Sequence, residues 1–279
     1  MSESLVSLLL GLGDDELVLG HRHSEWTGYA PHIEEDVAFS SIAQDEIGHA
    51  AVYYAVASKT AGRDPDQLAL GRPREQYRHA VLCERPNGDW AFTLARHWLY
   101  DHADALRLEA LEGSSHADLA ALAHKIRREE RYHLIHADMW MNRVAHGPAE
   151  GRSKLVDAMA RAWPEARGLF EPFDHEEEAV YKGWLPTPSA ELGTRWAGET
   201  ATLLDELGLP TEIHGRADES AEFVASSSGD LIAGTGNGSP APAESDEGTG
   251  GRRGRHTDDF ADLWEVMTGQ YRAHPGATW

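Results

Sequence analysis

Two copies of a Glu-x-x-His pattern constrain the fold of this chain more than any other feature. Glu46 and His49 form the first copy, and Glu130 and His133 form the second. On an α-helix, side chains three residues apart leave from the same face. Such a motif on each of two helices, with one carboxylate from each of two others, is the ligand set of a carboxylate-bridged dinuclear metal site in a four-helix bundle. The pattern therefore predicts an all-α chain built on such a bundle.

The two missing carboxylates lie where antiparallel hairpins require them. In such a hairpin, residues equidistant from the turn face each other. Reflecting Glu46 through the proline-marked break near position 31 reaches Glu16, and reflecting Glu130 through the Gly-Ser-Ser break near position 115 reaches Asp101. At about 1.5 Å per residue, these side chains would lie roughly 20 Å from each turn, deep in the bundle.

The predicted metal ligands are thus four carboxylates and two imidazoles: Glu16, Glu46, His49, Asp101, Glu130 and His133. Hard oxygen donors with imidazole suit Fe, or Mn, rather than Cu(I). We expect Glu46 and Glu130 to bridge or chelate, and each histidine to cap one ion. An acid precedes each histidine by four residues, so Asp45 is expected to bind His49 and Glu129 to bind His133. Alternatively, these groups pair with one another in a site without metal, where four buried carboxylates would repel strongly.

Apolar periodicity and turn residues predict helices and no strand of any length. A first helical region over 4–28 is expected to break at Gly11 and Gly13, so that Asp14-Asp15 would lie at the N-terminus of its main helix. The second helix has regularly spaced apolar residues that include Ile33 and Val37. The other predicted helical ranges are 31–61, 89–112, 116–145, 151–168, 189–207 and 257–272, with a short turn at 174–181.

The chain is predicted to divide into three parts. Residues 1–212 form the bundle with its extra helices, and residues 256–279 form a C-terminal helix and tail that pack back on it. Residues 213–255 are rich in Gly, Ser, Pro and acids, which predicts a flexible insertion. Its basic cluster at 252–255 could meet a phosphate or an acidic partner, or be a solvated turn.

Composition excludes several classes of protein. The net charge of −22 argues against nucleic-acid binding. No stretch of about 18 apolar residues predicts a membrane span, and the N-terminus lacks a basic signal-peptide region, so a cytoplasmic protein is expected. Cys83 is the only cysteine, which leaves metal binding to histidines and carboxylates. The acidic, lysine-poor composition favours a halophilic source, although a GC-rich genome would also replace Lys by Arg.

Aromatic and imidazole side chains outside the two motifs are expected to pack or to lie on the surface. Tyr100 and Tyr132 are adjacent to predicted ligands and are expected to pack in the bundle. The additional histidines have no matching spacing, and surface or packing roles are expected for His21, His23, His97, His102 and His136.

Several motifs together resemble those of the multicomponent phenylacetyl-CoA 1,2-epoxidase family of phenylacetate catabolism, and of its C-type subunit most closely. The resemblance covers nearly the whole chain except 213–249. Its motifs are Leu12-Gly13-Asp14-Asp15, Glu25-Trp26-x-Gly28-x-Ala30-Pro31, Glu84-x-Pro86-Asn87-Gly88, Glu130-x-x-His133-Leu134, Gly250-Gly251-Arg252-Arg253-Gly254-x-His256-Thr257 and Pro275-Gly276-x-x-Trp279.

This resemblance implies a ferritin-like bundle in a complex with a catalytic, di-iron A-type subunit, a small subunit and a reductase. That complex uses O2 to epoxidise the aromatic ring of an acyl-CoA. The C-type subunit of the family is a structural homologue of the A-type one and lacks several metal ligands, whereas this chain carries Glu16, Glu46 and His49. Three hypotheses follow: an oxygenase subunit with an intact di-iron site, a metal-free structural subunit, and a stand-alone ferritin-like di-iron oxidase.

Overall fold

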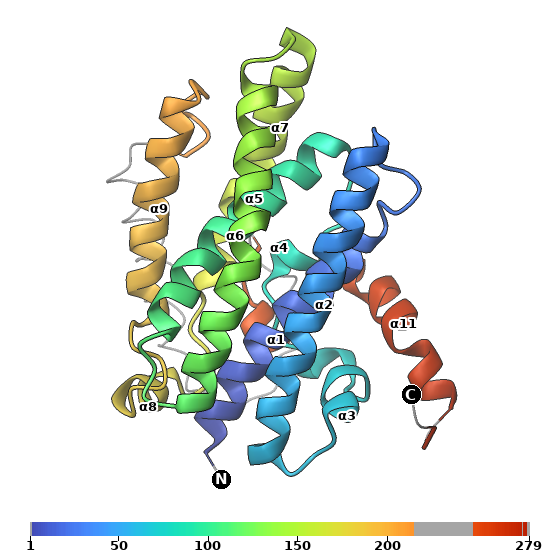
Figure 1. Cartoon of the computed structure of the whole chain (residues 1–279), viewed down its shortest axis with the longest axis vertical. Coiled ribbons are helices and arrows are strands. Elements are labelled where there is room, and N and C mark those ends of the chain that lie inside the picture. The colour runs from blue at the N-terminus through green and yellow to red at the C-terminus, as the bar shows by residue number, and fades with distance from the viewer. Residues whose placement is uncertain (1, 215–247, 275, 278–279) are drawn as a thin grey trace.

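The computed structural model describes residues 2–214, 248–274, 276 and 277. Every regular element in this part of the chain is a helix, which confirms the all-α, ferritin-like prediction. Four long helices form two antiparallel hairpins (Figure 1): α1 (Glu3–Ser24) with α2 (Ile33–Ala61), and α5 (Trp90–Leu111) with α6 (Ala117–Ala145). None of the described helices combines the length and apolar character that a membrane crossing needs.

Shorter elements join and cover the two hairpins. The connection between them contains α3 (Pro65–Leu70), η1 (Arg74–Gln76) and α4 (Val81–Glu84). After the bundle come α7 (Ala149–Ala166), η2 (Arg167–Phe170), α8 (Glu176–Tyr181), α9 (Ser189–Glu206), η5 (Gly251–Arg253) and α11 (Asp258–Ala273). Helices α7 and α9 pack against α5, which is buried on nearly all sides, while α11 lies by α3 and α4 at the opposite edge (Figure 1).

Helix α1 runs without a break through Gly11 and Gly13, so the predicted break is wrong. Both glycines are sites of close packing instead. A Cβ on Gly11 would meet the ring of Phe173, and one on Gly13 would lie 3.2 Å from Tyr53 Cβ. Glycine suits both positions because the neighbouring side chains leave no room for a Cβ atom.

The acids Asp14 and Asp15 are fully buried in the middle of α1, so their predicted capping role is also wrong. Asp14 is ion-paired with Arg72. Asp15 binds Arg107 at 3.0 Å and Arg252 at 2.7 Å. Burial would raise the pKa of Asp15, but the two guanidinium groups outweigh burial and lower it. Two consecutive buried charges are tolerated because each has a cationic partner from a distant segment.

Arg252, the first residue of the basic cluster at 252–255, also differs from its prediction, whereas Arg255 is exposed. Arg252 is 1% exposed and donates to Asp15 and to the main-chain oxygens of Gly11 and Arg78, so it is neither a solvated residue nor a free anion site. Most of the predicted insertion at 213–255, namely residues 215–247, lies outside the described part of the chain. Residues 275, 278 and 279 of the predicted tail also lie outside it.

Two of the family-like sequence motifs, one with Glu84 and one with His256-Thr257, meet at the buried carboxylate of Glu84. Glu84 Oε2 lies 2.7 Å from His79 Nε2 and 2.8 Å from His256 Nδ1, and Oε1 accepts from the N–H and hydroxyl of Thr257 at 2.7 Å. The His79 and His256 rings stack with centroids 4.1 Å apart and 16° between their planes. One metal ion cannot lie in the planes of two stacked rings, so this cluster fits a hydrogen-bonded clamp between the C-terminal segment and α4.

This clamp predicts loss of stability in acid. Burial would raise the pKa of Glu84, but its bonds from His256 and His79 hold that pKa well below the usual range. Burial lowers the pKa of His79 to about 4. Between about pH 6.5 and 4, His79 therefore binds more protons in the unfolded chain than in the folded chain, and the contribution of this clamp to the free energy of unfolding should fall as pH drops through that range. Urea unfolding followed by circular dichroism should show a smaller slope between about pH 6.5 and 4 for His79→Gln, which lacks the buried imidazole; equal slopes would contradict this prediction.

Candidate metal centre

All six predicted ligands are buried inside the bundle, and four of them contact one another directly. Each of its four helices contributes: α1 carries Glu16, α2 carries Glu46 and His49, α5 carries Asp101, and α6 carries Glu130 and His133. None of the six is more than 5% exposed. The two hairpins therefore place side chains that are far apart in the sequence in one water-poor region.

Glu130 lies between the two motif histidines. Its Oε1 is 3.1 Å from His49 Nδ1 and 3.0 Å from His133 Nδ1. His49 Nδ1 is also 3.2 Å from Glu16 Oε2. One donor atom each from Glu16, His49 and Glu130 lie within 4.8 Å of one another, which is close enough to share one ion. These contacts join four of the six predicted ligands directly.

The other two predicted ligands contact histidines outside the set. Glu46 Oε2 is 2.9 Å from His23 Nδ1, and Asp101 Oδ2 is 3.2 Å from His97 Nδ1 without hydrogen-bond alignment. Burial raises the pKa of Glu46 well above its usual value, and the charges of Glu16, Glu130 and Asp101 raise it further. Glu46 is therefore close enough to interact with the remaining carboxylates of the cluster.

The residues present fit a divalent metal ion. Three buried carboxylate oxygens have no hydrogen-bond partner: Glu46 Oε1 and both oxygens of Asp101. Buried acceptors without a donor are costly, and carboxylates this close together repel one another. A cation would relieve both costs, and this oxygen-rich set with imidazole suits Fe or Mn.

The outer partners of the two histidines are exchanged relative to the prediction. His49 Nε2 is 2.9 Å from Glu129 Oε2, and His133 Nε2 is 3.3 Å from Asp45 Oδ2. The expected pairs within one helix are therefore wrong. Helices α2 and α6 lie side by side, and each imidazole extends across the gap so that its Nε2 reaches the acid on the opposite helix. These pairs fix Nδ1 of each ring toward Glu130.

The neighbouring carboxylates favour the protonated form of both imidazoles. Burial would lower the pKa of His49, but its bonds to Glu130 and Glu16 outweigh burial and raise that pKa to about 11. Burial opposes the charge of His133 in the same way, but Glu130 and Asp45 raise its pKa to about 12. The same contacts hold the pKa of Glu130 well below its usual range. Metal binding at Nδ1 would therefore release protons.

Four residues beside the centre were missed as site residues in the sequence. His23 and His97 are fully buried against Glu46 and Asp101, and His97 Nε2 lies 3.4 Å from His136 Nδ1. Asp104 is 2% exposed, pairs with Arg107 at 3.2 Å and has one oxygen without a partner. Helical spacing could have identified three of them. His23 lies seven residues after Glu16, and His97 and Asp104 lie four before and three after Asp101, so each shares a helix face with a predicted ligand.

The two tyrosines differ in their positions. Tyr100 is buried as predicted, and its hydroxyl donates to Glu16 Oε1 at 2.8 Å, so it also holds a predicted ligand. Tyr132 is 72% exposed, and the expectation that it packs in the bundle is wrong.

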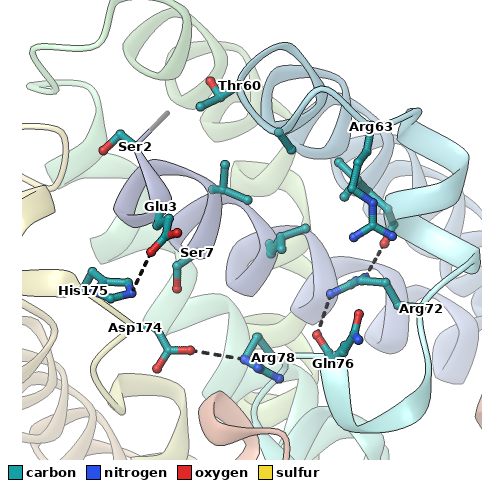
Figure 2. A pocket seen from close by; sticks show the side chains of 14 residues that line it. Ser2, Glu3, Ser7, Thr60, Arg63, Arg72, Gln76, Arg78, Asp174 and His175 are labelled. Atoms are coloured by element: carbon teal, nitrogen blue, oxygen red, sulfur yellow. Dashed lines mark hydrogen bonds and ion pairs between the residues drawn. The ribbon is translucent and has the colours of Figure 1, made fainter.

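A surface pocket of about 470 Å³ lies away from this centre (Figure 2). It lies between the start of α1, the end of α2 and residues 72–78, and none of the six predicted ligands lines it. Two of its three arginines are already paired, Arg72 with Asp14 and Arg78 with Asp174 at 3.5 Å. The pocket therefore offers little unpaired charge for a ligand.

Comparison with known proteins finds the same family that the sequence motifs resemble. The family model described as "Phenylacetic acid catabolic protein" matches residues 1–223. The chain is 29% identical over 276 residues, 99% of both chains, to the C-type subunit of the 1,2-phenylacetyl-CoA epoxidase of Escherichia coli (strain K12). It is 26% identical over 202 residues, 68% of this chain and 65% of the relative, to the A-type subunit of the same enzyme. With most of its length matched by the family model, the chain belongs to the phenylacetic acid catabolic protein family.

Proposed function

We propose that this chain is a subunit of a phenylacetyl-CoA epoxidase-type oxygenase in phenylacetate catabolism, and that it holds a dinuclear iron centre of its own. Family membership and similarity along the whole chain to a C-type subunit support the first part. The observation that carries the second is the position of Glu130 Oε1, about 3 Å from Nδ1 of both motif histidines.

Each side chain has a definite task in this proposal. Glu130 and Glu46 would hold both ions, with Glu16 and His49 on one ion and Asp101 and His133 on the other. Manganese would suit the same donors. When bound, the two ions would supply the redox chemistry that activates O2.

The surrounding residues orient these donors. Tyr100 holds Glu16, and His23 holds Glu46. Glu129 and Asp45 bind the outer nitrogens of the two histidines and so direct Nδ1 inward. The proposed partners are an A-type subunit, a small subunit and a reductase, and the proposed substrate is an acyl-CoA; the names of the two relatives support the A-type partner.

A metal-free structural subunit is the second candidate. The two protonated imidazoles already neutralise part of the carboxylate charge, which would let the cluster persist without an ion. Turnover of phenylacetyl-CoA by the reconstituted complex, with normal or Glu46→Ala chain, separates the two candidates. The proposal expects the variant complex to lose turnover while assembling normally. Unchanged turnover would favour the structural role.

The outer acids give a finer test on the isolated chain. Asp45→Asn and Glu129→Gln should each lower iron affinity about 10- to 100-fold, because the histidines lose the acceptors that orient them. Anaerobic Fe(II) titration followed by chelator competition measures this change. Glu150→Gln, on an exposed residue of α7, is the matched control and should bind like the unaltered chain. Equal affinity in all four proteins would contradict the assigned role.

A further inference from the structure

The outward face of α2 carries few charges: Glu34 lies at its start, Asp45 beside α6 and Lys59 at its end. Ile33 and Val37 are 77% and 67% exposed, although their spacing in the sequence predicted that they belong to the regular apolar face of this helix. Five further exposed positions continue the face without any charged residue: Ser41, Gln44, Gly48, Ala51 and Ala55. The solvent side of a helix normally carries charges, and charge depletion with exposed apolar groups is typical of protein interfaces.

The neighbouring helix α6 extends this surface. Tyr132, Ile135 and Met139 are 72%, 54% and 50% exposed, at spacings that place them on one side of the helix. With Tyr29, Ile33 and Val37, they are six of the eight large hydrophobic residues that are exposed in the described part of the chain. Exposed hydrophobic residues are therefore concentrated on α2, on the turn before it and on α6.

Four pairs show that the two helices lie side by side along this surface. Lys59 binds Asp118 at 2.7 Å, and His136 binds Glu35 at 2.8 Å. Between them are the pairs His49–Glu129 and His133–Asp45 described above. The exposed residues of α2 named above, together with Lys125, Arg128, Arg131, Tyr132, Ile135 and Met139 of α6, are called the α2–α6 face.

Three cations mark the α6 side of this face. Lys125, Arg128 and Arg131 are exposed and form no ion pair with any described residue, whereas Arg127 is paired with Glu109 and Glu112. The same three cations line a hollow of about 490 Å³ together with Glu129 and Tyr132. Unpaired cations at one place on a chain of net charge −22 favour a partner that brings carboxylates.

We propose that the α2–α6 face docks a second, different helical subunit whose contacting surface carries carboxylates opposite Lys125, Arg128 and Arg131. Gly48, Ala51 and Ala55 put only small groups on this side of α2, and no atom of the described chain lies within 4 Å of a Cβ placed on Gly48. Small residues let a ridge of side chains from another helix approach closely. A second copy of this chain fits less well, because it would bring the same cations and another net charge of −22.

Docking here would cover the two outer acids of the candidate metal centre. Asp45 and Glu129, which hold the two ligand histidines, are 44% and 41% exposed at their side chains and lie along this face. A subunit over them would exclude water from both hydrogen bonds, which strengthens such bonds. The inference rests on the proposed function, because the natural occupant is the A-type subunit of the same complex.

The test measures association between this chain and the A-type subunit from the same source. Ala51→Arg places a bulky charge among the small residues of α2, and Arg128→Glu reverses a cation on α6. Isothermal titration calorimetry should show each variant weakened by about tenfold or more. Arg128→Glu should also weaken the salt dependence. Tyr181→Ala and Lys154→Glu alter an exposed tyrosine and an exposed cation elsewhere, and both should bind normally.

Three results would overturn the inference in distinguishable ways. Normal binding by Ala51→Arg and Arg128→Glu, with unchanged circular dichroism and melting temperature, would move the interface elsewhere and leave the proposed function intact. A homodimer of the chain alone that Ala51→Arg breaks, seen by light scattering, would replace the occupant by a second copy. No association of the unaltered chain with the A-type subunit would overturn both the inference and the subunit role.

Discussion

Replacing Arg252 by methionine is expected to lower the free energy of unfolding by about 3–5 kcal/mol, because removal of one partner leaves a buried ion unpaired. Arg252 is 1% exposed, and its guanidinium binds both oxygens of Asp15, at 2.9 and 2.7 Å. Methionine keeps much of the volume but none of the five donors. Denaturant unfolding of the two proteins at neutral pH measures the difference.

Arg253→Met provides the matched control. Arg253 adjoins Arg252 in the sequence, but its side chain is 32% exposed and its partner Asp174 is 40% exposed. Exposed pairs contribute about 0–1 kcal/mol. A loss at Arg252 no larger than that at Arg253 would contradict the role of Arg252 as the link between the C-terminal segment and α1.

Replacing Glu130 by glutamine is expected to lower the affinity for both metal ions by more than about 100-fold. Even outer partners of metal ligands cost 10- to 100-fold when removed, and Glu130 contacts the ligand nitrogens of both histidines. The two imidazoles would also lose their shared counter-charge, so their pKa values should fall. Anaerobic metal titration with Fe(II), and with Co(II) as a spectroscopic substitute, reads the affinity directly.

Glu150→Gln controls for loss of one acidic charge, because Glu150 is 85% exposed at its side chain and distant from the centre in the sequence. Two ions bound by Glu130→Gln with normal affinity would show that the assigned centre is wrong. Loss of affinity with a folded, helical protein would support it.

Much of the fold followed from local rules. Apolar periodicity and turn residues located the four bundle helices within a few residues, because helix boundaries depend on nearby side chains. The hairpin reflection brought Glu16 and Asp101 to the two motifs because equal distances from a turn place residues at equal heights. Both inferences need only helix geometry and a known turn.

The features that were missed depend on contacts between distant segments. Asp14 and Asp15 looked like a helix start, and only the arrival of Arg72, Arg107 and Arg252 explains two buried acids inside α1. The exchange of Asp45 and Glu129 between histidines likewise depends on how α2 and α6 lie against each other. Spacing along one helix cannot show which acid a neighbouring helix presents.

Family similarity and the chain's own buried residues support different parts of the proposed function. The similarity to a C-type subunit supports membership of an oxygenase complex. The six buried donors, several without hydrogen-bond partners, support a metal centre in this chain. The α2–α6 face connects both ideas, because a docked subunit would lie over the outer acids of the two histidines.

Metal content of the chain purified alone tests the central claim most directly. Elemental analysis would be made after anaerobic loading with Fe(II) and removal of unbound metal, beside a Glu46→Ala/His133→Ala double variant. The account predicts about two Fe per chain in the unaltered protein, from the two Glu-x-x-His motifs, and loss of that iron in the folded variant. No bound metal in the unaltered chain, or equal metal in both proteins, would contradict it.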